Sequence, residues 1–144
     1  MDCDMLVTTD IHEVLQYYNE NKAVSVCKHD YVPKTEMKAT GKQTNYPKKN
    51  WSSFMLFNNN LCKNLTPEYV NNATPMNLHR FMWTTEDLIG TIPLEWNWLC
   101  GEYEYKKNVN NIHYTLGVPC FEEYKDCDYS DLWHEEFKLT TYHK

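Results

Sequence analysis

In the first thirty positions, two short apolar runs flank a stretch in which apolar residues recur at helical spacing. Residues 5–7 and 23–27 are short apolar runs, and each predicts a strand, the first being the end of a buried strand. Between them, apolar residues within 11–18 recur every three to four positions and predict a helix. Asp10 is a typical N-cap for that helix, with Glu13 as its capping-box partner. This strand–helix–strand order predicts an α/β fold in which helices cover a sheet.

The remaining pattern predicts further short elements joined by loops. We expect strands at 51–57 and 111–115, and short helices starting at Thr66, spanning 85–88 with Gly90 closing the turn, and running from Ser130 to Phe137. Residues 28–50 predict a long, lysine-rich loop, while 93–103 is aromatic without a clear period. Neither repeats nor a linker interrupt this order, so we expect a single domain over residues 1–144.

Composition restricts the class of protein. An apolar content of 42% with 15% aromatic residues excludes a disordered chain, and no apolar run approaches the ~18 residues of a membrane span. Acidic residues exceed basic ones by 20 to 14, which argues against nucleic acid as a partner. Six cysteines form no C-x-x-C pair and no secretory signal precedes them, so we expect free thiols and a cytoplasmic location.

The sequence Asp2-Cys3-Asp4 is the strongest candidate for chemistry. Carboxylates two positions apart on a strand point to the same side, and such a pair suits Mn²⁺ or Mg²⁺ shared with phosphate oxygens. A second copy, Asp126-Cys127-Asp128, lies in a polar stretch, and we interpret it as a solvated loop. The first copy is therefore the candidate metal site.

His113 is a candidate third ligand, because it lies at the end of a predicted strand and imidazole binds transition metals. On its own, a histidine in a strand is more often a structural residue whose hydrogen bonds are satisfied. The sequence contains no G-x-S-x-G nucleophile motif, no P-loop and no zinc-ligand spacing.

Four segments together resemble a known family. They are DCD at 2–4, NWSSFMLFN at 50–58, IPLEWNW at 92–98 and IHYTLG at 112–117. In this order they resemble the second half of family 8-type glycosyltransferases of the GT-A fold, which include glycogenin and bacterial galactosyltransferases. The chain looks most similar to a bacterial and phage branch that carries a comparable PLEWNW segment.

This resemblance implies a partial GT-A fold, with a mixed sheet flanked by helices. It implies a metal-dependent transferase that moves a sugar from a nucleotide-diphosphate sugar to a glycan or other small acceptor, with retention of configuration. In the family, a nucleotide-binding half precedes the D-x-D motif, and we expect that half to be missing here. The chain alone is then expected to bind metal weakly and to be inactive, with a missing half or a second copy as its partner.

The resemblance also assigns roles to individual residues. The metal, Mn²⁺ or Mg²⁺, would be held by Asp2, Asp4 and His113. The donor sugar would be bound by Asn50, Ser52, Ser53, Trp96 and Gly117. Glu95 and Asn97 are the candidate catalytic residues.

The chain also departs from the family pattern. A lysine that follows the family's histidine is replaced by the sequence Gly117-Val118-Pro119-Cys120, so a lysine of the 34–49 loop would have to contact the phosphates. The family's D-Q-D motif is absent, which leaves the acceptor chemistry unassigned.

Two alternatives remain open at this point. Five tryptophans and eleven tyrosines suit a non-catalytic carbohydrate-binding or interaction module, because aromatic rings stack on sugars. A structural remnant with an exposed first strand would instead present an edge for aggregation or docking.

Overall fold

The computed structural model describes residues 1–141, and its strands form three small sheets. In the first sheet, β2 (Val24–Cys27) is central. It pairs antiparallel with β5 (Met55–Phe57) and parallel with β6 (Ile89–Ile92). All four residues of β2 are buried, as expected for the centre of a sheet that is covered on both faces.

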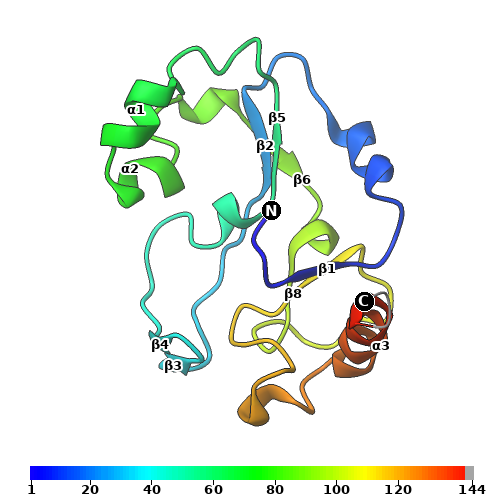
Figure 1. The fold of residues 1–144 in the computed structure, drawn as a ribbon. Coiled ribbons are helices and arrows are strands. Elements are labelled where there is room, and N and C mark those ends of the chain that lie inside the picture. The colour runs from blue at the N-terminus through cyan, green and yellow to red at the C-terminus, as the bar shows by residue number, and fades with distance from the viewer. Residues whose placement is uncertain (142–144) are drawn as a thin grey trace.

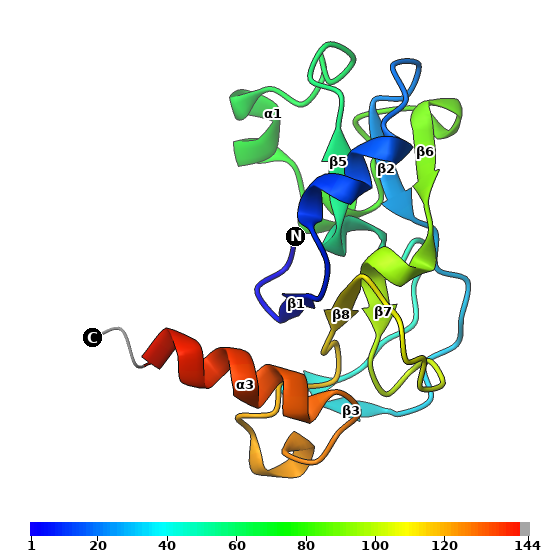
Figure 2. The ribbon, with the colours of Figure 1, turned by 90° about the vertical axis from the view of Figure 1, so that its right-hand side faces the viewer.

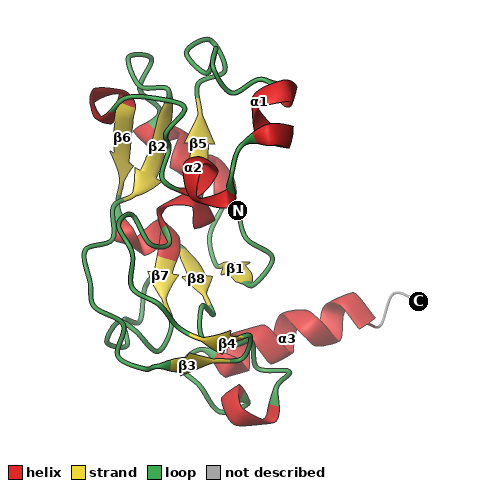
Figure 3. Cartoon of the chain, turned by 90° about the vertical axis from the view of Figure 1, so that its left-hand side faces the viewer, coloured by secondary structure: helices red, strands yellow, loops and turns green. Residues whose placement is uncertain are grey.

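The second sheet lies below the first in the view of Figure 3. Its central strand β8 (Asn111–His113) pairs antiparallel with β1 (Met5–Val7) and parallel with β7 (Trp98–Leu99). A third sheet is the hairpin of β3 (Met37–Lys38) and β4 (Gly41–Lys42). The chain is thus a mixed α/β protein, as the sequence predicts.

The helices are short and mostly of the 3-10 type. The 3-10 helices are η1 (Ile11–Tyr17), η2 (Trp51–Ser53), η3 (Glu86–Leu88), η4 (Leu94–Asn97) and η5 (Glu122–Tyr124). The α-helices are α1 (Pro67–Asn72), α2 (Pro75–His79) and α3 (Ser130–Thr141). Helices α1 and α2 lie beside the first sheet, whereas α3 lies beyond the second (Figure 1 and Figure 2). None of the described helices has the length and apolar character needed to cross a membrane.

The buried side chains form three apolar clusters, and each involves a different part of the fold. One contains Val24, Phe81 and Trp83 against the first sheet, and a second contains Phe54 and Trp96 between the sheets. The third contains Ile112, Tyr114 and Tyr129 beneath α3. The second cluster therefore joins the two main sheets.

Several elements differ from those that the sequence predicts. The strand expected at 51–57 begins only at Met55, because residues 51–53 form a 3-10 turn after Asn50, whose φ is 62°. Gly90 does not close a helix but lies within β6, where a Cβ atom would come within 2.4 Å of Ser25 Oγ on β2. The absent side chain lets these two strands pair at normal distance.

The expected loop at 28–50 contains the β3–β4 hairpin, and α2 was not predicted at all. The expectation that Asp2 and Asp4 end a buried strand is wrong. They precede β1, whose pairing with β8 begins at Met5, and β1 itself is only half-buried. Backbone hydrogen bonds outside the sheet hold these two residues.

Candidate metal centre

The first residues of the chain run between the two main sheets, as Figure 1 shows from the position of the N-terminus. The backbone N–H of Asp2 donates to the carbonyl of Ser53 at 2.9 Å. The carbonyl of Asp4 accepts from the N–H of Tyr114, also at 2.9 Å. These two bonds place the carboxylates beside the end of β8, where His113 lies.

Asp2, Asp4 and His113 form one cluster. One ligand atom from each of the three side chains lies within 4.8 Å of the others. The Nε2 atom of His113 is 3.4 Å from Oδ1 of Asp4, and this oxygen is buried without a hydrogen-bond partner among residues 1–141. A buried, unpaired carboxylate oxygen is costly, and a bound cation is one way to compensate for it.

Asn97 determines which face of the imidazole points at the carboxylates. Its Nδ2 donates to the carbonyl of Asn50 at 2.9 Å, so its Oδ1 is the atom that faces Nδ1 of His113, at 2.8 Å. Nδ1 therefore carries a proton, and Nε2 is the ring nitrogen that faces Asp4. Histidines that bind metals are commonly fixed in this way by a hydrogen bond to the other ring nitrogen.

The electrostatic balance keeps Asp4 ionised. Burial acts to raise the pKa of its carboxyl group, but the neighbouring His113 acts in the opposite direction and the net pKa is lowered. The ammonium group of Lys38 also lowers the pKa of Asp4, by a smaller amount. An ionised carboxylate is the form that binds a divalent cation.

A cavity of about 490 Å³ adjoins the cluster. Asp2 and Asp4 lie in its wall, together with Lys38, Gly117 and the half-exposed ring of Phe121. It therefore combines two carboxylates, one ammonium group and an apolar surface. Gly117 is closely packed here, because a Cβ atom would lie 2.4 Å from the ring of Tyr124.

Other residues implied by the resemblance lie nearby without reaching the cavity. Asn50 supports Asn97 through its carbonyl, and Ser53 is buried and supports Asp2. Ser52 bonds instead to Nδ1 of His79 at 2.7 Å.

Three further candidates have different surroundings from those expected. Trp96 is completely buried, with its ring stacked on Phe54 at a centroid distance of 5.9 Å. It therefore belongs to the core and does not line the cavity. Glu95 pairs with Lys106, and Asn97 contacts His113 but is itself fully buried. The structure thus makes Asn97 a positioning residue.

The second D-x-D sequence is located as expected. Asp126 and Asp128 are exposed turn residues between η5 and α3. The sequence analysis expected a lysine of the 34–49 loop at the phosphates without choosing among them, and Lys38, at the end of β3, is the one that lines this cavity. Its place in the β3–β4 hairpin, which depends on the fold, distinguishes it from the other lysines of the loop.

Comparison with known proteins gives one curated relative. The chain is similar to Protein CDI of Arabidopsis thaliana, with 42% identity over 146 residues that cover 96% of this chain. The match covers 56% of the relative, so the chain spans little more than half of that protein's length. No protein-family model matches the chain, and no solved structure matches it.

The burial of His29 predicts that the stability of the protein depends on pH. Burial, with a smaller effect of His113, lowers the pKa of His29 to about 3, from an ordinary value of 6.5. Between these values the unfolded chain binds a proton that the folded chain does not, so the free energy of unfolding falls as the pH falls. We expect a loss of up to about 3 kcal/mol from His29 between pH 6.5 and 4.

Urea denaturation of the protein and of His29→Gln across this pH range measures the effect. The difference between the two free energies of unfolding should change steadily with pH. Parallel profiles for the two proteins would show that His29 is not buried in its neutral form.

Proposed function

We propose that Asp2, Asp4 and His113 bind Mn²⁺ or Mg²⁺, and that this centre serves the transfer of a sugar from a nucleotide-diphosphate sugar. The observation that carries the proposal is the orientation of His113, whose Nε2 is turned by Asn97 toward two carboxylates. One imidazole nitrogen and carboxylate oxygens are a donor set that suits Mn²⁺.

The chain's own residues support specific parts of this activity. A bound cation would stabilise the negative charge that develops on the departing diphosphate. Lys38 in the cavity wall adds a positive charge beside the same position. Phe121 and Val118 provide an apolar surface against which a sugar ring can pack, in a cavity of about 490 Å³.

The resemblance in four ordered segments supports the same activity and a partial GT-A fold. The pairing of parallel and antiparallel strands around β2 is compatible with part of such a sheet. The six free cysteines support a cytoplasmic location for the protein. The proposal includes a longer protein: in it, this chain would supply the metal-binding part and another segment would bind the nucleotide.

The tryptophans give little support to a carbohydrate-binding module. Binding by stacking requires exposed rings, but all five tryptophans pack in the apolar clusters. Trp83 and Trp96 are buried outright.

The test is Mn²⁺ binding, measured by the paramagnetic relaxation of water protons, with and without uridine diphosphate. We expect the protein to bind Mn²⁺ and uridine diphosphate to strengthen that binding, because the diphosphate completes the coordination. His113→Ala should remove the relaxation effect, since it deletes the nitrogen ligand. His12→Ala, an exposed histidine on η1, is the matched control.

Equal Mn²⁺ binding by these two variants would contradict the metal site. Binding of uridine diphosphate that persists unchanged in a chelator would contradict the proposed role of the metal.

A further inference from the structure

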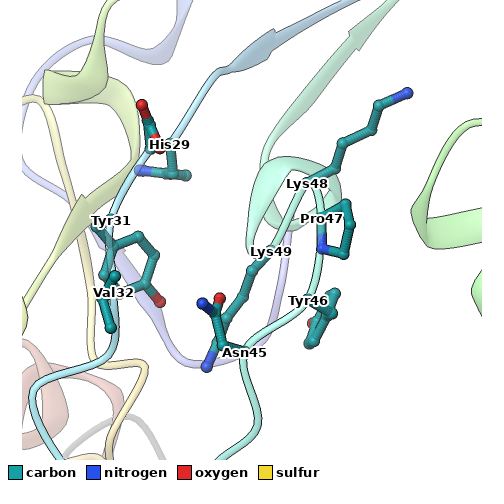
Figure 4. Close-up of a pocket in the computed structure, with 9 residues that line it drawn as sticks. His29, Tyr31, Val32, Asn45, Tyr46, Pro47, Lys48 and Lys49 are labelled. Atoms are coloured by element: carbon teal, nitrogen blue, oxygen red, sulfur yellow. The ribbon is translucent and has the colours of Figure 1, made fainter.

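A second cavity, of about 390 Å³, lies between residues 29–32 and residues 45–49. Figure 4 shows the two chain segments facing each other, with Tyr31 and Val32 on one side and Asn45 and Lys49 on the other. We refer to it as the His29–Lys49 cavity. None of the residues that line it is a candidate metal ligand.

Lys49 supplies the central charge of this cavity. Its side chain is only 7% exposed, and its ammonium group donates to Oε1 of Gln43 at 2.9 Å and to the carbonyl of Thr44 at 2.8 Å. An ammonium group has three N–H donors, and no third acceptor is found for it in the described part of the chain. Both hydrogen-bond partners are neutral, and the rings of Tyr31 and Tyr46, with centroids 6.0 and 5.9 Å away, add only cation–π contacts, so no carboxylate touches the charge.

Glu102 is an acidic residue close to Lys49, but its carboxylate does not contact the ammonium group directly. Its Oε1 accepts from Nε2 of Gln43 at 2.9 Å, so one amide separates the carboxylate from Lys49. Burial lowers the pKa of Lys49 despite the opposing effect of Glu102. The positive charge of Lys49 is therefore incompletely compensated, and an anion placed beside it would be stabilised.

The cavity wall holds further hydrogen-bond donors without acceptors. The hydroxyl oxygen of Tyr31 accepts from Nδ2 of Asn50 at 2.9 Å, which leaves the phenolic proton available to donate. Burial raises the pKa of Tyr31, so this proton is retained. Within residues 1–141, neither the amide of Asn45 nor Nε2 of His29 has a partner, and His29 is only 6% exposed.

The other charged residues of the wall are directed elsewhere or exposed. Lys48 points away from Lys49 in Figure 4 and pairs with Glu86. Asp30 is the acidic residue of the wall, and it is exposed to solvent. The cavity therefore presents donors from Lys49 and Tyr31, with the amide of the exposed residue Asn45 at its rim and the unpartnered Nε2 of His29 in its wall.

We propose that the His29–Lys49 cavity binds an oxyanion, a phosphoryl or carboxylate group, that is not held by the metal. Several converging donors around one buried ammonium group form the arrangement that such a group requires. Asn50 connects this site to the metal centre, since it also donates to Thr115 at 3.4 Å and accepts from Asn97. This inference rests on the proposed function. If the protein is a sugar transferase, the acceptor of the sugar is an acidic molecule whose anionic group binds in this cavity.

The test is calorimetric titration in EDTA, so that no metal contributes, with inorganic phosphate in one arm and glucuronate in the other. We expect one of the two anions to bind the protein, and the arm that gives heat identifies the group. Val32→Glu places a carboxylate at the rim, where Val32 is 76% exposed, and should weaken binding at least tenfold. The matched control is Val70→Glu on α1, outside the cavity, which should bind as the original protein does.

Tyr31→Phe removes one donor while keeping the ring, and we expect about tenfold weaker binding. Tyr105→Phe, at a tyrosine that is 60% exposed, should have no effect. His113→Ala should lose Mn²⁺ yet keep the anion, which separates this site from the proposed metal centre. The proposal is overturned if neither anion binds, or if Val32→Glu and Val70→Glu bind equally well.

Discussion

Replacing Asp4 with asparagine is expected to weaken Mn²⁺ binding by about 100-fold or more. Asp4 is half-buried next to His113, and its inner oxygen has no hydrogen-bond partner in the described chain. Substituting an amide keeps the volume but removes the negative charge and leaves a neutral oxygen as ligand. Changing residues that only support metal ligands already costs 10–100-fold, so loss of a charged ligand should exceed that range.

Asp128→Asn is the control for this prediction. It changes the equivalent position of the second D-x-D sequence, in an exposed turn, and should leave the affinity for Mn²⁺ unchanged. Electron paramagnetic resonance of free Mn²⁺ measures both affinities. If the two variants bind Mn²⁺ alike, the cation is attracted by the general acidic surface and not by the cluster around His113.

Replacing Trp96 with alanine is expected to lower the free energy of unfolding by about 3–5 kcal/mol. Trp96 is fully buried between the two main sheets, where it stacks on Phe54 and packs with Val14, Cys27 and Ile92. Removing the indole would leave a large cavity in the cluster that joins the sheets. Thermal and urea denaturation followed by circular dichroism measure the loss.

Trp96→Phe retains an aromatic ring and should cost clearly less than the alanine variant. The resemblance to glycosyltransferases places Trp96 at the donor sugar. If that were so, the expected result would be different. A surface tryptophan could be removed with little loss of stability while ligand binding disappears. That outcome would contradict the buried position of the indole.

Local sequence signals predicted elements whose residue pattern or cap lies within the element itself. Strand β2 is a short, mostly apolar run rich in valine, and α1 begins at Pro67 behind the capping residue Thr66, whose hydroxyl accepts from the N–H of Tyr69 at 3.1 Å. Asp10 caps η1 as expected, although its side chain accepts from His12 and Glu13 accepts from Thr9. Gly90 shows the limit of such signals, because its presence in β6 depends on Ser25 in a distant part of the chain.

The candidate metal ligands illustrate the same division. Residue type and order were enough to select Asp2, Asp4 and His113, because carboxylate and imidazole groups are the ligands in question. Their approach to within 4.8 Å depends on hydrogen bonds from residues 2 and 4 to residues 53 and 114. No periodicity in the sequence encodes these contacts.

The sequence by itself determined the α/β class, the strands β1, β2, β5 and β8, and which residue types were candidates for binding a divalent cation. Those properties follow from local periodicity and from side-chain chemistry. Only the tertiary structure decided that Asn97 orients His113, that Trp96 is core, and that Lys49 faces a second cavity. The physical reason is that burial and hydrogen-bond partners belong to pairs of residues distant in sequence, and these pairs exist only after the chain has folded.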